Sequence, residues 1–368
     1  MLFDLRPKAS KAELYGREDE LKRITSSFKS DVPLILLLGV RRVGKTSLLR
    51  TALAETDEPS IYLDARRLDE EGYSRSVLYE MLSEEVSRLS TKWNKIKGIL
   101  GHVKGVHLEG AKIELDWAKD GLSLQSLLRS LDDWSSQSRN ARNVLVAVDE
   151  AQLLRNMAGG KGRIDFRSLI AYCYDNLRHI KFVLVGSEVG LLLGFLGLED
   201  PKSPLYGRGR TEIILRRFSR KKSLGFLEAG FRECGINYKK EMLEMVVDKL
   251  DGVVGWLTLY GNKASEAGRP DRNLLASVIE LAKVMAKKEI ESVLARSRYY
   301  RLALGSLGNG RFRWSEIKKD IISQTGRFVT DAQVSRALDG LSRLGIVSKE
   351  RDQYQISDPV VRELACRL

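Results

Sequence analysis

The residues with the clearest chemical meaning lie at positions 39–46, which read Gly-Val-Arg-Arg-Val-Gly-Lys-Thr. Two glycines, a lysine and a threonine at this spacing form a phosphate-binding loop. The glycines let successive N–H groups turn toward phosphate oxygens, and the positive end of the following helix attracts the anion. In such a loop, Lys45 reaches the β- and γ-phosphates and the Thr46 hydroxyl binds Mg²⁺. The apolar run before the loop and the helix-forming run after it are the context that the motif requires.

A second pair of reactive residues, Asp149 and Glu150, follows an apolar run at 144–148. Because parallel strands end at one edge of a sheet, Asp149 is expected to hold Mg²⁺ beside the nucleotide. Glu150 is expected to polarise the attacking water. The alternative is an ordinary acidic turn, but the phosphate loop upstream favours the metal site. A kinase would need an acceptor site and an arginine-rich lid, and neither pattern is seen, so the pair indicates hydrolysis.

Two other polar positions have two interpretations each. Ser187 ends an apolar run at 181–187. It would either position water and sense the γ-phosphate, or cap the helix that follows. Arg208 ends the sequence Pro-Leu-Tyr-Gly-Arg and has more arginines nearby. It would either stabilise charge in the transition state or belong to a solvated basic loop.

The apolar spacing predicts an α/β domain over residues 1–217. Strands are predicted at 33–39, 60–64, 143–149, 181–187 and 211–215, with helices at 45–54, 74–89, 122–135 and 166–176. Alternating strands and helices predict a parallel sheet with helices on both faces. Alternating apolar and polar residues around Gly110 predict an inserted β-hairpin at about 105–117.

Two further parts follow this domain. Helices predicted at 221–233, 240–250, 256–267 and 272–295 make a lid-like helical subdomain over 218–297. A helix at 314–322, a capping box at Thr330 and Gln333, and a two-stranded wing at 346–349 and 353–356 predict a winged-helix domain over 298–368. Its second helix can enter a major groove and present Gln333 or Arg336 to base edges. Winged helices also pack against protein, and the sequence leaves both partners open.

Composition limits the class of protein. The chain has 368 residues with 43% hydrophobic residues, which excludes wholesale disorder. Three widely spaced cysteines provide no disulfide framework and make a structural zinc site unexpected. The apolar runs are too short to span a bilayer and the N-terminus lacks a signal-peptide pattern, so a cytoplasmic protein without membrane contact is expected.

The chain is basic, with 62 Lys+Arg against 49 Asp+Glu and a net charge of +13. Residues 296–368 hold 14 basic and 8 acidic residues, which is +6 of that excess. Such a charge is either a solvated surface or a site for a polyanion such as duplex DNA.

Taken together, the motifs resemble the archaeal ATPase family, whose members are P-loop proteins related to AAA+ and STAND ATPases. The resemblance rests on Tyr-Gly-Arg-Glu-Asp-Glu-Leu at 15–21, the phosphate loop, Val-Ala-Val-Asp-Glu-Ala-Gln at 146–152, Val-Leu-Val-Gly-Ser-Glu at 183–188, Ser-Pro-Leu-Tyr-Gly-Arg at 203–208 and Tyr-Gln-Ile-Ser-Asp-Pro at 354–359. One departure is Trp256, which stands where related ATPases often have proline, so the coupling of the lid to the nucleotide is left open.

The resemblance implies an ATPase that binds ATP, ADP and Mg²⁺. It places 15–17 near the adenine, Ser187 at the sensor position and Arg208 toward the γ-phosphate. The candidate nucleotide-binding residues are Tyr15, Gly16, Arg17, Gly39, Arg41, Arg42, Val43, Gly44, Lys45, Thr46 and Ser47. The candidate catalytic residues are Lys45, Asp149, Glu150, Ser187 and Arg208, and the candidate metal ligands are Thr46 and Asp149.

The expected function is an ATP-hydrolysing molecular switch that acts on DNA or is regulated through it. The alternative is a STAND-like signalling ATPase whose winged helix binds a protein. The sequence predicts neither the oligomeric state nor the identity of such a partner.

Overall fold

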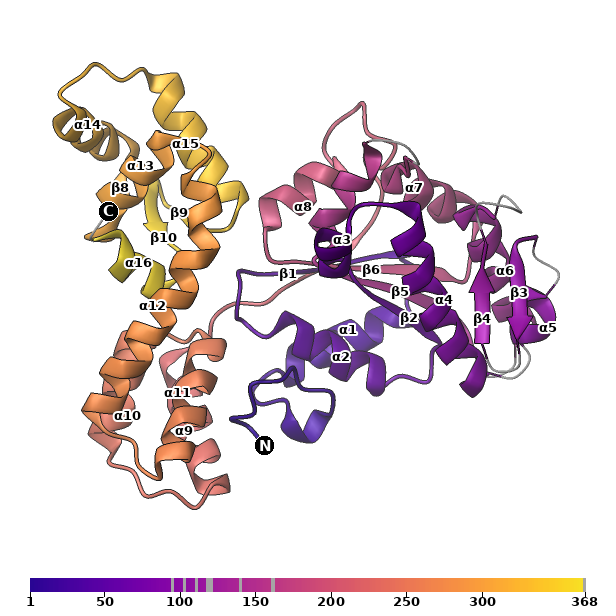
Figure 1. The fold of residues 1–368 in the computed structure, drawn as a ribbon, viewed down its shortest axis with the longest axis horizontal. Helices are drawn as coiled ribbons and strands as arrows, with labels where there is room; N and C mark the ends of the chain where they lie inside the picture. Colours follow the sequence, from indigo (N-terminus) through magenta and orange to yellow (C-terminus); the bar gives the residue numbers. More distant parts are fainter. Residues whose placement is uncertain are drawn as a thin grey trace.

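The structure is a computed structural model that describes residues 1–93, 96–101, 104–109, 112–116, 122–138, 141–159 and 163–366. An α/β part lies beside a column made of the lid helices and the winged helix (Figure 1). The long helix α12 (Arg272–Leu294) runs from the lid to the winged helix. Among the described residues, no helix combines the length and the apolar character that a membrane crossing needs.

The α/β part is built on five parallel strands in the order β2-β5-β6-β1-β7. The strands are β1 (Leu34–Leu38), β2 (Ser60–Asp64), β5 (Val144–Asp149), β6 (Ile180–Gly186) and β7 (Thr211–Ile214). These are the five strands that the apolar runs predict. Because all five run the same way, their carboxyl ends share one edge, where the phosphate loop follows β1 and Asp149 ends β5.

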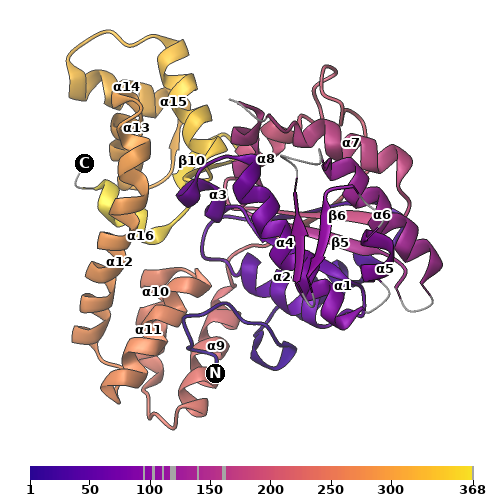
Figure 2. The same ribbon diagram turned by 45° about the vertical axis from the view of Figure 1, so that its right-hand side comes forward.

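Helices cover both faces of the sheet, as predicted. In β1 the side chains of Ile35 and Leu37 pack with α1 and α2, whereas Leu34, Leu36 and Leu38 pack toward the opposite helices. The helices α1 and α2 lie below the sheet, and α7 and α8 lie above it (Figure 2). Their bounds are α1 (Glu18–Phe28), α2 (Lys45–Ala54), α3 (Arg66–Glu71), α4 (Arg75–Lys92), α5 (Ile96–Leu100), α6 (Leu124–Gln137), α7 (Phe166–Asn176) and α8 (Val189–Leu196), with short 3₁₀ helices η1 (Lys11–Glu13) and η2 (Ala151–Ala158).

The predicted hairpin is present as antiparallel strands β3 (Val106–Glu109) and β4 (Lys112–Leu115). Positions 110, 111 and 117 of the prediction lie outside the described residues. The Ile113 N–H donates to the Ser87 hydroxyl over 2.8 Å, so β4 is fixed to α4.

The lid and the winged helix follow. Their elements are α9 (Arg220–Glu233), α10 (Lys240–Leu250), α11 (Val254–Ala267), α12, α13 (Arg298–Gly308), β8 (Phe312–Arg313), α14 (Trp314–Thr325), α15 (Asp331–Arg343), β9 (Val347–Glu350), β10 (Gln353–Ile356) and α16 (Pro359–Ala365). The predicted capping box of α15 is present. The predicted two-stranded wing is present as the antiparallel pair β9 and β10, and β8, which was not predicted, pairs with β10 as a third strand.

Buried side chains of the lid and the winged helix form one continuous hydrophobic cluster. The division at 217 and 297 therefore stays a proposal. We expect the lid and the winged helix to move together as one unit relative to the central sheet.

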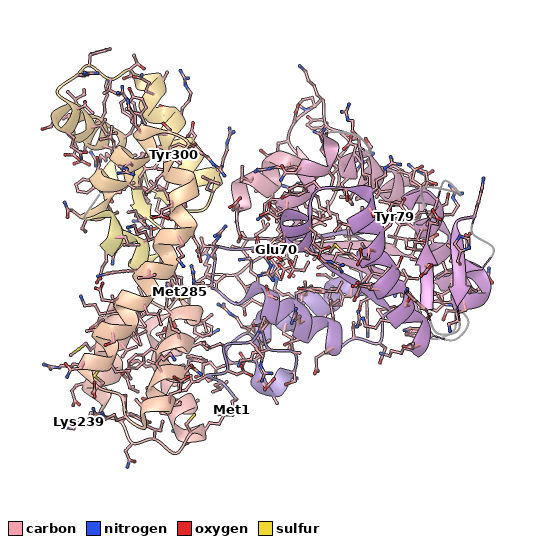
Figure 3. The ribbon with its side chains drawn as sticks, in the orientation of Figure 1. Met1, Glu70, Tyr79, Lys239, Met285 and Tyr300 are labelled. Carbon is pink, nitrogen blue, oxygen red and sulfur yellow. The ribbon has the colours of Figure 1, made fainter. Side chains whose placement is uncertain are left out.

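The N-terminal segment joins the lid to the α/β part, at the place where the two meet (Figure 3). Phe3 is 2% exposed and is inserted between α9 and α11. A Cβ on Gly230 or Gly261 would lie 2.2 or 2.3 Å from its ring atoms, so only glycine leaves room for the ring. At the other end of the segment, the Lys8 N–H donates to the Ser47 hydroxyl on α2 over 3.1 Å.

We expect Phe3→Ala to loosen the lid, because removing a buried phenyl ring costs about 3–5 kcal/mol. The variant should unfold at a lower urea concentration than the parent chain. Leu5→Ala is the matched control, since Leu5 is 56% exposed and its loss should leave the midpoint unchanged. Equal midpoints for the two variants would contradict the anchoring role of Phe3.

Candidate functional site

The loop between β1 and α2 has the conformation that phosphate binding requires. A Cβ on Gly39 would lie 2.5 Å from the backbone oxygen that follows β7, and Gly44 has a φ of +95°. Lys45 begins α2 with a buried side chain, and its Nζ donates to the Val40 oxygen over 2.8 Å. Burial lowers the pKa of Lys45 to about 8 against the opposing charge of nearby carboxylates. An ammonium group buried in this way is stabilised by an anion such as a phosphate.

Two hard oxygen ligands lie side by side at the edge of the sheet. The Thr46 hydroxyl donates to Asp149 Oδ2 over 2.7 Å, and Asp149 is 1% exposed. Burial raises the pKa of Asp149, and a nearby cation would keep this carboxylate charged. Thr46 and Asp149 are the residues that would hold Mg²⁺, since this ion takes few protein ligands together with phosphate oxygens and water.

A tyrosine on β2 completes this pair, and the sequence reasoning missed it. The Tyr62 hydroxyl donates to Asp149 Oδ2 over 3.3 Å. Burial raises the pKa of Tyr62 to about 12, so the hydroxyl stays a donor at neutral pH. The only signal in the sequence is its place two residues before the end of a predicted strand, which does not distinguish it from a packing residue.

The Glu150 carboxylate is held in one orientation. Its Oε2 accepts hydrogen bonds from Ser187 Oγ at 2.6 Å and from Gln152 Nε2 at 2.7 Å. Burial would raise the pKa of Glu150, but these two hydrogen bonds and the neighbouring cations lower it overall. Ser187 does not cap α8, because Glu188 occupies the N-cap position. Gln152 was not singled out from the sequence, since a glutamine after an acidic pair has many ordinary roles.

A cavity of about 760 Å³, partly open to solvent, adjoins the other end of the phosphate loop. Its lining residues come from the N-terminal segment, the loop and the lid, and they include Tyr15, Arg17, Val43, Gly44 and Ser47. The Tyr15 ring meets two lid phenylalanines edge-on at 5.6 and 6.3 Å. The structure therefore brings Tyr15 and Arg17 to one cavity with Val43, Gly44 and Ser47, and a nucleobase site there stays a prediction.

Arg17 contributes its side chain to the scaffold of this cavity. Its Nη2 donates to the backbone oxygens of Val43 and Arg216, at 3.0 and 2.7 Å. Its guanidinium also lies 4.6 Å from the Phe218 ring centroid. Lys222 of α9 donates to the Gly16 oxygen over 2.8 Å. These contacts connect the phosphate loop to the start of the lid.

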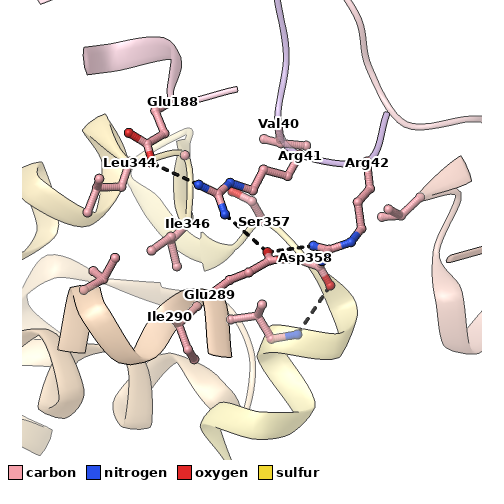
Figure 4. Close-up of a pocket in the computed structure, with 14 residues that line it drawn as sticks. Val40, Arg41, Arg42, Glu188, Glu289, Ile290, Leu344, Ile346, Ser357 and Asp358 are labelled. Carbon is pink, nitrogen blue, oxygen red and sulfur yellow. Dashed lines mark hydrogen bonds and ion pairs between the residues drawn. The ribbon is translucent and has the colours of Figure 1, made fainter. Parts of the chain in front are cut away.

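The two arginines of the loop face the C-terminal parts. Arg42 pairs with Glu289 of α12, and Arg41 pairs with Glu188 at 3.1 Å and with Glu289 at 3.4 Å (Figure 4). A cavity of about 600 Å³ lies between the loop, α12 and the winged helix. Glu188 and Glu289 were not anticipated, because a contact over this sequence separation has no local signal.

Trp256 connects the loop to the winged helix. It is 1% exposed, and its ring centroid lies 4.0 Å from the Arg42 guanidinium carbon. Its indole N–H donates to both Asp358 oxygens, the nearer at 2.9 Å. Asp358 in turn caps α16 by accepting N–H bonds from Val360 and Val361. A continuous path of contacts thus runs from the loop to α16.

Arg208 is not brought to the phosphate loop of its own chain. It forms a two-pronged ion pair with Asp175 at 2.7 and 2.8 Å and lies over the Tyr174 ring. Asp175 is near the end of α7, and Arg208 precedes β7. Both positions are at the amino edge of the sheet, opposite the loop. A role for Arg208 at its own nucleotide does not fit this arrangement.

The two candidate base-reading residues differ in their surroundings. Gln333 Oε1 accepts the Thr330 N–H at 2.9 Å, so this group is engaged in the helix cap. Arg336 is exposed, and its Nε donates to the Ala332 oxygen one turn earlier. Of the two, Arg336 is the side chain available to a partner.

Comparisons with known proteins agree with this architecture. The family described as "ATPase domain predominantly from Archaea" matches residues 14–259, and the "MCM protein C-terminal winged helix-turn-helix domain" matches 290–357. None of the curated proteins compared matches the chain.

Among solved structures, the Walker-type ATPase of Pyrococcus abyssi is 34% identical, with a TM-score of 0.82 and full coverage of both chains. The ORC2 protein of Aeropyrum pernix, in an ADP form, is 14% identical with a TM-score of 0.57, covers 100% of this chain and is itself covered over 96%. The second likeness concerns the fold alone. With most of its length matched by one family and by a homologous structure, the chain belongs to the archaeal ATPase family.

Proposed function

We propose that this ATPase is an Mg²⁺-dependent molecular switch that hydrolyses ATP. The observation that carries the proposal is the hydrogen bond between Thr46 and Asp149, which sets two metal ligands beside the oriented Glu150 carboxylate. Bound there, Mg²⁺ would neutralise charge on the phosphates. Lys45 faces the same phosphates from the start of α2, where the helix dipole adds to its charge.

Glu150 is suited to accept the proton of an attacking water. Its lowered pKa keeps it ionised at neutral pH, as a base must be. Ser187 and Gln152 both donate to Oε2, so one oxygen is fixed while the carboxylate keeps acceptor capacity for water. In this proposal Ser187 acts through Glu150 as well as through any contact with a phosphate.

The switch would use the contacts of the loop arginines. Arg42 lies on Trp256, and Trp256 holds Asp358, so a shift of the loop on nucleotide binding would be passed to α16. Glu289 connects the same loop to α12. The lid and the winged helix would therefore respond together to the nucleotide.

Duplex DNA is the partner we favour for the winged helix. The charge of +6 over 296–368 and the exposed Arg336 support it. The end of α15 packs on α8, where a Cβ on Gly190 would lie 2.6 Å from the Arg343 Cα. DNA access to this end of α15 would then depend on the position of the winged helix. The same contact supports the alternative, a signalling ATPase whose winged helix binds protein.

We expect Glu150→Gln to bind ATP and keep it, because the metal ligands remain while the base is lost. Turnover should fall by about 10²–10⁴, the usual contribution of a general base. Lys45→Ala is the contrasting variant and should lose affinity for ATP and ADP alike. Steady-state phosphate release and filter retention of labelled ATP measure both effects. Parental turnover in Glu150→Gln would show that another group activates the water.

Arg208 is expected to act on the nucleotide of a neighbouring chain. Arg208→Ala should then lower turnover by orders of magnitude and leave ADP affinity intact, since ADP lacks the γ-phosphate. Mixing Arg208→Ala with Glu150→Gln chains should restore activity, because the first supplies the base and the second supplies the arginine. Parental turnover in Arg208→Ala alone would assign this residue to its ion pair with Asp175.

Binding to duplex DNA should weaken as salt rises, and Arg336→Ala should lower the salt slope by about one if Arg336 contacts a phosphate. Fluorescence anisotropy with a labelled duplex at several salt concentrations gives both slopes. Arg6→Ala is the control, because the Arg6 side chain is 87% exposed and far from α15 in the sequence. Absence of salt-dependent binding in the parent chain would favour the protein-binding alternative.

A further inference from the structure

The neighbouring arginines of the phosphate loop have different surroundings. The Arg42 side chain is 17% exposed and lies over Trp256, and the Arg42 backbone oxygen accepts the Gly255 N–H over 2.9 Å. The Arg41 side chain is 49% exposed, and its ion pairs in the described part of the chain are with Glu188 and Glu289 (Figure 4). Arg42 is therefore the more buried of the two and stacks on a ring, whereas Arg41 is half exposed and bridges two carboxylates.

Arg41 lies on the side of the loop where a γ-phosphate would be. Its neighbour Val40 accepts the Lys45 ammonium, the group that faces the β- and γ-phosphates. Arg41 also pairs with Glu188, the residue after Ser187, whose hydroxyl donates to Glu150 Oε2 over 2.6 Å. These contacts connect Arg41 to both groups that flank the reacting phosphate.

We propose that Arg41 distinguishes ATP from ADP by exchanging its two carboxylate partners for the γ-phosphate. This inference rests on the proposed ATPase function and assigns the choice of nucleotide to one side chain. A guanidinium binds phosphate through a planar, two-pronged contact, and a γ-phosphate has more negative charge than one carboxylate. The two carboxylates can lose Arg41 as a partner because water still reaches them: the side chains of Glu188 and Glu289 are 17% and 32% exposed.

The exchange would affect the two glutamates differently. Glu289 also pairs with Arg42 and keeps that partner after Arg41 leaves. Glu188 has Arg41 as its ion-pair partner within the described residues, and it is the N-cap residue of α8. At Gly190, α8 packs on the end of α15. Release of Glu188 would therefore change the contact between α8 and the winged helix.

A double-mutant cycle on Arg41 and Glu188 tests the proposal in the full chain. The readouts are dissociation constants for ADP and for a non-hydrolysable ATP analogue, both with Mg²⁺. Arg41→Ala should weaken binding of the analogue about tenfold or more while ADP affinity changes less than about twofold. Glu188→Gln removes a competitor and should strengthen binding of the analogue only. In the Arg41→Ala background the same Glu188→Gln change should have no effect.

Arg210→Ala is the control for a general loss of positive charge. Arg210 lies just before β7 and pairs with Glu212, which lies within that strand. Neither affinity should change in this variant. Equal losses for ADP and the analogue in Arg41→Ala, or no loss for either, would overturn the inference while leaving the ATPase function standing. A parent chain that binds neither nucleotide would overturn both. If Arg41→Ala unfolds, Glu188→Gln alone tests the inference. A ratio of ADP affinity to analogue affinity equal to that of the parent chain would then overturn it.

Discussion

The parallel register of the central sheet is the constraint on which the site depends. Leu38 pairs with Gly186, and Asp64 pairs with Asp149, so neighbouring strands end at the same level. The phosphate loop follows β1, the acidic pair lies at the end of β5, and Ser187 follows β6. A change of register by one residue would move these groups by about 3.3 Å, more than the tolerance of the hydrogen bonds that join them.

Trp256 connects the phosphate loop to the winged helix through two different parts of its side chain. Proline at this position would offer no aromatic face and no indole N–H. Tryptophan supplies both, through a cation–π contact of about 0.5–2 kcal/mol with Arg42 and a hydrogen bond to the Asp358 carboxylate. In this chain the connection from the phosphate loop through the lid residue Trp256 therefore reaches the winged helix.

The features predicted from the sequence are those whose geometry is set within a short segment. The strands, the phosphate loop and the capping box of α15 belong to this class, because local spacing determines their conformation. The sequence analysis missed three residues, Tyr62, Gln152 and Glu289, because their roles depend on contacts that form only in the folded structure. The third wing strand was missed because its two residues, Phe312 and Arg313, are too few for a period to be seen.

Arg208 illustrates why order along the chain does not determine place in the fold. It follows the sensor strand in sequence, but β7 runs parallel to β1, so residues that precede β7 lie at the amino edge. Its own nucleotide would lie at the carboxyl edge, beyond the full length of the strands. An Arg208 that contacts a phosphate must therefore reach that of another chain, with the amino edge of one sheet facing the carboxyl edge of the next. With one edge of a sheet facing the opposite edge of the next, the contact is head-to-tail, and its repetition produces rings if the rotation closes and filaments if it does not.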